Sequence, residues 1–340
     1  MDRRDFMKGS AVALGSFVSV EGAVRASIQE QGTNSSEHMP GKIGRPVRAV
    51  SIGFKPGLSL EQIAGLVDKE GARGADIIAL PETCRGGSPE GLDGPTISTL
   101  SGLARKHRTF VVCPINRKTG DRLLNSAVLL DRRGQIAGVY DKMYPFLKEF
   151  AKSPGVQPGQ AVTVFPTDFG RIGLAICFDV NWAAPWQRLS DLGAELVIWP
   201  SAYSAGRSLQ ARAIDYNYYV MSATWTPDCL VYDIDGEQLA YDHNNMSNGT
   251  NITRFTFDLD RCLFHQDFNL PTKLANLLKD HEEDVEREKW LPMEGWFVLK
   301  AKRSGVSARE LARRYGLEER RPYINRSRCE VDKLRGWQFS

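Results

Sequence analysis

Histidine is scarce in this chain, with five among 340 residues, and its six cysteines are widely separated. No histidine accompanies a cysteine at the spacing of a metal-ligand motif, so no metal site is predicted. Neither sign of charge is in large excess: the formal net charge is +3, which gives no reason to expect nucleic acid or an anionic membrane as the main partner. Beyond the N-terminus, no apolar run is long enough to cross a membrane. The remaining composition, 42% hydrophobic and 25% charged, is typical of a globular protein.

The first 26 residues have the features of a targeting segment. Residues 2–8, Asp-Arg-Arg-Asp-Phe-Met-Lys, resemble the twin-arginine export signal of bacteria, and a mildly apolar stretch follows over residues 9–20. Val24-Arg25-Ala26 offers small residues at a cleavage site. We expect a signal peptide over residues 1–26, a linker over residues 27–45, and a mature protein that is periplasmic or secreted. The alternative is a basic amphipathic N-terminus on a cytosolic protein.

Short apolar runs alternate with helical periodicity between residues 46 and 271, which we expect to form the main domain. The strands predicted by apolar runs include 47–54, 75–81, 109–115, 171–177, 195–199, 218–223 and 252–258, with hairpins such as 125–130 and 135–140. The helices predicted by periodicity include 59–73, 95–107, 184–192 and 209–216. This alternation predicts mixed sheets covered by helices, which is a layered α/β fold.

Three of the predicted strands end in reactive side chains. Residues 77–81 lead into Glu82, a hairpin strand leads into Lys142, and residues 173–176 lead into Cys177. Strand ends and the loops after them are where α/β proteins build their sites. A cysteine is a strong nucleophile only as thiolate, which a nearby base or cation supplies. Each residue also has a plainer interpretation: a buried core thiol, a solvated carboxylate at a helix start, and a surface lysine.

The chain order Glu82, Lys142, Cys177, with gaps of 60 and 35 residues, resembles that of the carbon-nitrogen hydrolase (nitrilase) superfamily. The resemblance covers roughly residues 45–270. It implies a four-layer αββα sandwich, in which two mixed β-sheets lie face to face with helices outside. It also implies that Cys177 is the nucleophile, that Glu82 is the general base and acid, and that Lys142 and the backbone N–H of Phe178 stabilise the oxyanion. This chemistry needs neither a cofactor nor a metal.

Two further residues match the family pattern. Many relatives carry a second glutamate shortly after the lysine, and Glu149, seven positions after Lys142, is the candidate. Its alternative role is ordinary surface charge. Ser201 lies in the run Trp-Pro-Ser-Ala, which resembles the strand end that lines one wall of the family's cleft. We therefore expect both residues to support the site.

The segment after the cysteine departs from the amidase-like pattern. Such relatives usually have an Arg and then Pro-Glu in the positions that are here Asn181, Ala183 and Ala184. This difference concerns the subfamily and the local loop, because none of these positions belongs to the expected triad. We expect Asn181 and Trp182 to face the substrate instead, and the indole would favour a flat or apolar group.

The pair Phe178-Asp179 after the cysteine is typical of the amidase and carbamoylase branches, whereas true nitrilases usually have Trp-Glu there. The resemblance therefore implies hydrolysis of a small-molecule linear amide or N-carbamoyl compound through a thioester. True nitrilase activity is one alternative. The other is a non-catalytic binding or assembly module on the same fold.

Residues 272–340 are expected to form a helical C-terminal extension rich in charge. Between residues 300 and 335 there are 12 Lys or Arg against 5 Asp or Glu. Residues 307–317 have some resemblance to the start of a helix-turn-helix, but a charge run is more often a solvated helix face, and no nucleic acid partner is predicted. We expect the extension to lie on the main domain or on a partner subunit of a homo-oligomer.

Overall fold

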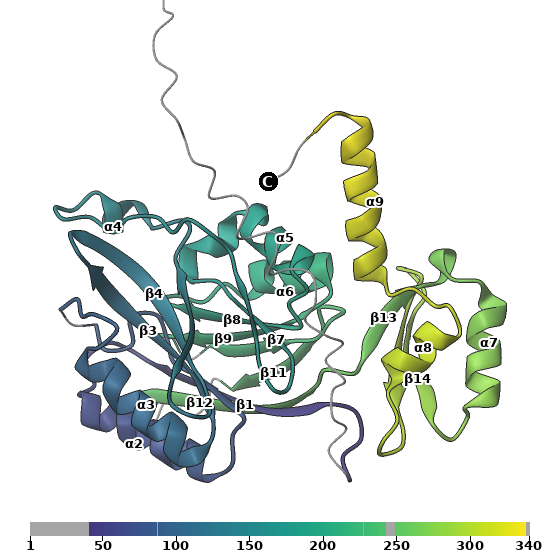
Figure 1. The fold of residues 1–340 in the computed structure, drawn as a ribbon, viewed down its shortest axis with the longest axis horizontal. Coiled ribbons are helices and arrows are strands. Elements are labelled where there is room, and N and C mark those ends of the chain that lie inside the picture. The colour runs from purple at the N-terminus through teal and green to yellow at the C-terminus, as the bar shows by residue number, and fades with distance from the viewer. Residues whose placement is uncertain (1–40, 87, 227, 243–248, 338–340) are drawn as a thin grey trace, which may run out of the picture. The chain divides into compact units, whose positions relative to one another are not determined.

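The computed structural model describes residues 41–86, 88–226, 228–242 and 249–337 (Figure 1). The predicted signal peptide, and the predicted linker up to residue 40, lie outside these ranges. None of the helices in the described ranges combines the length and the apolar character needed to span a bilayer.

The first of two large sheets has six strands in the order β12-β1-β2-β3-β4-β5. Strands β1, β2 and β3 run parallel, and the other neighbours pair antiparallel, so the sheet is mixed. In chain order the strands are β1 Pro46–Phe54, β2 Ile77–Ala79, β3 Phe110–Thr119, β4 Arg122–Leu130, β5 Ile136–Asp141 and β12 Thr250–Asp258.

The second sheet also has six strands, in the order β11-β10-β9-β8-β7-β6. Its central strands β7, β8 and β9 are parallel, and the outer pairs are antiparallel. Its strands are β6 Val164–Pro166, β7 Arg171–Leu174, β8 Leu196–Ser201, β9 Tyr219–Thr224, β10 Cys229–Tyr232 and β11 Gln238–Asp242.

The two sheets pack face to face, and helices cover their outer faces. Because side chains alternate along a strand, Val47 and Ala49 of β1 join the core between the sheets, whereas Val50 and Ile52 pack with helices. The helices on the first sheet are α2 Leu60–Ala72 and α3 Pro95–His107, and those on the second are α5 Ala183–Asp191 and α6 Gly206–Tyr216. The predicted αββα sandwich is therefore confirmed.

One predicted strand ends earlier than expected, at the point that matters most for the site. Strand β7 stops at Leu174, and a 3-10 helix, η1, spans Cys177–Asn181. Cys177 itself has a positive φ of 45°. A non-glycine residue in this left-handed region cannot continue a strand. The chain consequently turns sharply at the thiol.

The helical C-terminal region is present, and it also contains strands that its charge-rich sequence did not predict. Its helices are α7 Pro271–Asp280, α8 Ala308–Arg314 and α9 Arg320–Leu334. Its strands β14 Val285–Leu291 and β15 Trp296–Ala301 pair antiparallel, and β13 Cys262–His265 adds to β15. Helix α8 packs on this sheet through a small core of its own. Only one face of β14 meets that core, so its sequence lacks a continuous apolar run.

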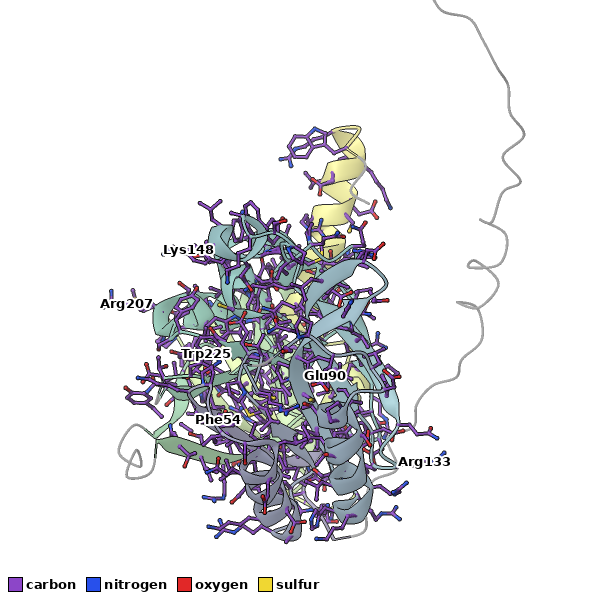
Figure 2. All side chains as sticks on the ribbon, turned by 90° about the vertical axis from the view of Figure 1, so that its left-hand side faces the viewer. Phe54, Glu90, Arg133, Lys148, Arg207 and Trp225 are labelled. Atoms are coloured by element: carbon purple, nitrogen blue, oxygen red, sulfur yellow. The ribbon has the colours of Figure 1, made fainter. Side chains whose placement is uncertain are left out.

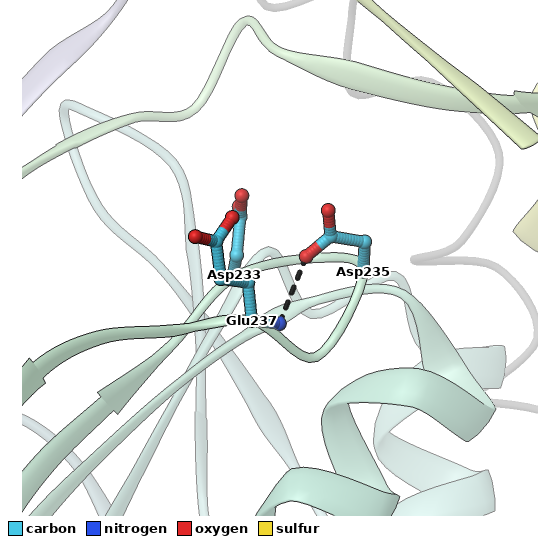
Figure 3. A group of neighbouring side chains, drawn as sticks. All are labelled: Asp233, Asp235 and Glu237. Carbon is cyan, nitrogen blue, oxygen red and sulfur yellow. Dashed lines mark hydrogen bonds between the residues drawn. The ribbon is translucent and has the colours of Figure 1, made fainter. Parts of the chain in front are cut away.

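An ion-pair cluster attaches strand β14 to the second sheet. Asp233, Asp235 and Glu237 gather their carboxylates at the turn between β10 and β11 (Figure 3). The Lys289 ammonium of β14 lies 2.7 Å, 2.8 Å and 2.5 Å from these three carboxylates in turn. Arg261 also pairs with Asp233. Two cations of the chain itself, Lys289 and Arg261, thus offset much of the negative charge of this acidic cluster.

The cations of α9 have partners within the described part of the chain. Arg326 pairs with Glu318, and Arg328 pairs with Asp191 of α5. Lys333 and Arg335 pair with acids of the helix itself. The pair of Arg328 with Asp191 joins α9 to α5, and the pairs of Lys333 and Arg335 lie along the helix itself. This agrees with the interpretation of the charge run as a helix face.

Candidate active site

A cavity of about 730 Å³ opens where strands of both sheets end. Figure 2 views the molecule from the side on which Trp225, one of the lining residues, is labelled. The predicted residues Glu82, Lys142 and Cys177 all line this cavity. Aromatic and aliphatic side chains form much of the remaining wall, among them Phe146, Phe178, Trp225, Leu123 and Val156. The fold therefore brings the three strand-end residues to one place.

The turn at Cys177 is held by a buried carboxylate. Asp179 accepts hydrogen bonds from the backbone N–H groups of Ile176 and Tyr144, at 2.9 Å and 2.8 Å, and from the Tyr140 hydroxyl at 2.7 Å. Burial raises the pKa of Asp179 to about 6, although these donors oppose the shift. The indole of Trp199 donates to the carbonyl of Cys177 at 2.9 Å. These bonds stabilise a backbone conformation that would otherwise cost about 1–3 kcal/mol.

Cys177 is buried, with 7% of the residue exposed. Burial raises its pKa to about 12, and the negative charge of Glu82 acts in the same direction. The positive charge of Lys142 and hydrogen bonds from Ala202 and Ser201 oppose this shift without overcoming it. Nucleophilic attack by this sulfur therefore requires that its proton be passed to a base.

Glu82 is a buried carboxylate of the same cavity, and both of its carboxylate oxygens accept hydrogen bonds. The residue is 3% exposed. Its Oε1 accepts from Lys142 Nζ at 2.8 Å and from Asn125 Nδ2 at 2.7 Å, and its Oε2 accepts from Ala202 N at 2.8 Å. Trp225 donates to its carbonyl at 2.6 Å. The carboxylate is thus held in a single orientation by both sheets.

Lys142 lies between two carboxylates. Its Nζ donates to Glu82 Oε1 at 2.8 Å and to Glu149 Oε2 at 2.7 Å, and the residue is 1% exposed. Burial alone would lower the pKa of Lys142, but the charges of Glu82, Cys177 and Glu149 outweigh it and raise the pKa. The ammonium therefore stays charged beside the thiol, where it can stabilise developing negative charge.

Glu149, the expected second glutamate, joins this network from the short helix α4 Leu147–Phe150. Its Oε2 also accepts from the backbone N–H of Phe146 at 2.7 Å. Burial would raise the pKa of Glu149, but Lys142 and the hydrogen-bond donors around it lower it on balance. Glu149 therefore contacts Lys142, Asn125 and the backbone of Phe146, unlike a solvated surface carboxylate.

The other predicted site residues occupy three different places. Phe178 and Asn181 line the cavity, and Asn181 Nδ2 donates to the Phe178 carbonyl at 3.0 Å. Trp182 is not among the lining residues: its ring stacks on Tyr144, with centroids 4.2 Å apart, behind Phe178. Ser201 is fully buried and binds the backbone of Tyr203 through its hydroxyl. It shapes the turn that presents the N–H of Ala202 to Glu82.

Asn125 belongs to the site but was not among the predicted residues. It lies on β4, is 1% exposed, and contacts both glutamates of the network. Its only signal in the sequence is an amide in front of the apolar run 126–130. That signal does not distinguish a site residue from the polar start of a hairpin strand.

The family model of carbon-nitrogen hydrolases matches residues 57–258. Because this match covers more than half of the chain, the protein belongs to the carbon-nitrogen hydrolase family, as the order of Glu82, Lys142 and Cys177 predicted.

Similar sequences include enzymes that act on amides. The chain is 33% identical over 188 residues to the nitrilase and fragile histidine triad fusion protein of Drosophila melanogaster, covering 48% of this chain and 41% of that protein. It is 29% identical over 149 residues to deaminated glutathione amidase of Yersinia enterocolitica, covering 38% and 52%. It is 25% identical over 243 residues to omega-amidase NIT2 of Bos taurus, covering 64% and 85%. The chain spans about half the length of the first two relatives.

Solved structures share the fold at low sequence identity. A carbon-nitrogen hydrolase from Helicobacter pylori G27 has a TM-score of 0.57 at 19% identity and covers 64% of this chain and 90% of its own. An amidase from Nesterenkonia sp. has a TM-score of 0.53 at 20% identity and covers 64% and 93%. These similarities support the αββα architecture described above.

Proposed function

We propose that this carbon-nitrogen hydrolase cleaves linear amides or N-carbamoyl compounds, with Cys177 as the nucleophile, Glu82 as the general base and acid, and Lys142 as the oxyanion-stabilising cation. The observation that carries the proposal is the 2.8 Å hydrogen bond from Lys142 Nζ to Glu82 Oε1 in the cavity that Cys177 also lines. Amidases among the similar sequences support an amide substrate.

In the first half of the reaction, the Cys177 proton moves to Glu82 as the sulfur attacks the carbonyl carbon. The carbonyl oxygen becomes an oxyanion, which the Lys142 ammonium and the backbone N–H of Phe178 stabilise. Glu82 then gives its proton to the leaving nitrogen, the carbon–nitrogen bond breaks, and ammonia or an amine departs. A thioester on Cys177 remains.

In the second half, Glu82 removes a proton from a water molecule that attacks the thioester carbonyl. The same cation stabilises the second oxyanion. When the carbon–sulfur bond breaks, the proton held by Glu82 returns to the sulfur, which restores the thiol of Cys177. One carboxylate thus serves as base and acid alternately, and proton transfer of this kind contributes about 10²–10⁴-fold to the rate.

The cavity wall favours a small substrate with an apolar portion. Phe146, Phe178 and Trp225 present ring surfaces, while the polar groups gather around the thiol. Lys152 also lines the cavity, and within the described residues it has no ion-pair partner. We infer that a substrate enters with its carbon–nitrogen bond toward Cys177 and its remaining portion along the aromatic wall.

The test is turnover by the purified chain. We expect ammonia release from members of a panel of linear amides and N-carbamoyl compounds, and none of that release from Cys177→Ala. Nitriles in the same panel test the nitrilase alternative. Amide turnover that survives in Cys177→Ala would contradict the nucleophile, and a wild-type chain that releases nothing from any compound would favour a non-catalytic module.

We also propose that residues 1–26 direct export and that the chain self-associates through its C-terminal region. The twin arginines support export. Apolar side chains of α9 and beyond that stay exposed support self-association: Leu334 is 88% and Trp337 is 55% exposed. Cell fractionation of a twin-lysine variant at positions 3 and 4, and the solution mass of Leu334→Ser, test the two points. A variant that is exported normally, or a wild-type monomer, would contradict them.

A further inference from the structure

We propose that Asn125 is a positioning residue of this site: it closes a hydrogen-bonded ring around Lys142 and directs proton exchange to one oxygen of Glu82. The inference rests on the proposed roles of Glu82, Lys142 and Cys177. It assigns to an uncharged residue the task of keeping two carboxylates together in one orientation.

The ring follows from five contacts. Asn125 Nδ2 donates to Glu82 Oε1 at 2.7 Å and to Glu149 Oε1 at 2.9 Å. Lys142 Nζ donates to Glu82 Oε1 at 2.8 Å and to Glu149 Oε2 at 2.7 Å. The backbone carbonyl of Asn125 accepts from the N–H of Lys142 at 2.9 Å. One residue of β4 therefore contacts every charged member of the network except the thiol.

The orientation of the Asn125 amide follows from its neighbours. An amide group has two N–H donors on nitrogen and only acceptors on oxygen. If its oxygen faced the carboxylates, it would meet two further acceptors, so only the nitrogen suits this position. The Asn125 amide can thus donate one N–H to each of the two glutamates. Lys142 has the same arrangement, so two donors hold two carboxylates.

This arrangement leaves the two oxygens of Glu82 unequal. Each carboxylate oxygen accepts about two hydrogen bonds. Oε1 is filled by Lys142 and Asn125, whereas among the described residues Oε2 accepts only from the N–H of Ala202. The free acceptor site of Glu82 is consequently on Oε2. By occupying the second site on Oε1, Asn125 makes Oε2 the oxygen that exchanges a proton with Cys177.

The sharpest test replaces Asn125 with aspartate, which keeps the shape and exchanges the amide for an acid. The titratable groups that surround this position are Glu82, Lys142, Glu149 from α4 and Cys177 from η1. Near neutral pH the introduced carboxylate repels both glutamates. When it is protonated, it regains one O–H donor and restores part of the ring.

We therefore expect Asn125→Asp to lose about 100-fold in kcat at pH 8, with little change in KM, and to recover relative to wild type as the pH falls. The ratio of mutant to wild-type kcat should rise about tenfold from pH 8 to pH 5. Asn125→Ala should lose a similar factor at pH 8 without any such recovery, because alanine offers no donor at either pH. A purely structural role would give both variants a ratio that is independent of pH.

Asn116 supplies a matched control. It pairs directly with Asn125 across β3 and β4 and lines the same cavity, but it makes no hydrogen bond with either glutamate. Whatever the overall rate of Asn116→Asp, its ratio to wild type should change less than threefold between pH 5 and pH 8. A rise like that of Asn125→Asp would show that any added carboxyl gives the effect and would overturn the assignment.

The rate of Cys177 alkylation by iodoacetamide gives a second measurement that needs no turnover. The charge added by Asn125→Asp should slow alkylation at pH 8 relative to wild type, and the ratio should recover toward pH 5, in a chain whose circular dichroism confirms folding. If the wild-type chain hydrolyses nothing but this ratio behaves as stated, the proposed function fails and the positioning role stands. A flat ratio in both measurements, or Asn125→Ala with kcat within threefold of wild type, overturns the positioning role.

Discussion

Replacing Glu82 with glutamine tests whether Glu82 is the base. The substitution should affect the acidity of the Cys177 thiol and the transfer of its proton in different ways. The side chain keeps its shape but loses its charge and its basicity. One face of Glu82 meets Lys142 and Asn125, and the other meets the N–H of Ala202. In either orientation of the new amide, its NH₂ group faces a donor. We expect a stability loss of about 1–3 kcal/mol, which leaves the chain folded.

The size of the kinetic effect follows from the pKa of Cys177. Burial raises that pKa to about 12. At pH 7, about five units below this value, a free thiolate costs about 7 kcal/mol and makes up about 10⁻⁵ of the molecules. Without Glu82 the enzyme has to use the free thiolate, whose population in the variant is at least this large because the charge of Glu82 is gone. We expect kcat/KM for an amide to fall by about 10²–10⁴, with about 10⁵ as the ceiling.

The same change should make the thiol more acidic. Besides burial, the charge of Glu82 raises the pKa of Cys177, and the charge of Lys142 lowers it. Removal of Glu82 leaves the ammonium as the main charge beside the sulfur. Thiolate formation should then have its midpoint at lower pH than in the wild type, so thiol reactivity and turnover change in opposite directions.

Alkylation and ammonia release provide the assay. Alkylation of Cys177 by iodoacetamide is followed by intact mass from pH 6 to pH 10, and ammonia release is measured on the same preparations. Cys177→Ser is the control: it should release no ammonia, and its remaining alkylation, chiefly at the exposed Cys329, is subtracted. Alkylation of Cys177 that is no faster in Glu82→Gln than in wild type over this pH range, or turnover within tenfold of wild type, would refute the assignment of Glu82 as the base.

Three further predictions concern charge and stability. Lys142→Met should lower kcat by about 10²–10³-fold through loss of the oxyanion cation, and a loss under threefold would contradict that role. Asp233→Asn should lower the free energy of unfolding in urea by about 3 kcal/mol, because Arg261 is 9% exposed and loses a buried partner. Asp168→Asn, at a 57% exposed carboxylate, should cost under about 1 kcal/mol, and equal losses would refute this account. The pKa of Asp179 is about 6 in the folded chain against an ordinary value of 3.8 for an aspartate, so the folded chain binds this proton more tightly. Stability from this group is therefore lost as the pH rises from about 4 to 6, by about 3 kcal/mol, and Asp179→Asn should abolish that loss.

Much of the main domain was predictable because its strands are apolar and its helices are periodic. The runs over 47–54 and 109–115 became β1 and β3 with small shifts of their ends. Strand β14 was not predictable, since its sequence Val-Glu-Arg-Glu-Lys-Trp-Leu alternates charges on a solvent face. The early end of β7 was also hidden. An apolar strand can continue into a cysteine, and only the turn fixed by Asp179 shows that it does not.

Candidate site residues were easier to predict when their side chains are ionisable or nucleophilic. Glu149, seven positions after Lys142, was expected from the resemblance to the family, and it does contact Lys142. Trp182 was expected to face the substrate, and in the structure its ring stacks on Tyr144. Asn125 and Trp225 were not identified, since an amide and an indole have many ordinary roles in strands.

The primary structure alone determined the alternation of strands and helices, and the order of Glu82, Lys142 and Cys177 along it indicated the family. These properties are local, because they depend on apolar periodicity and on the chemistry of single side chains. Only the folded chain decided that burial raises the pKa of the Cys177 thiol, that Glu82 Oε1 accepts from two side chains and Oε2 from the N–H of Ala202, and that Asn125 contacts both glutamates. These features depend on burial and on hydrogen bonds between segments that are 24 to 120 positions apart, and no local pattern specifies either.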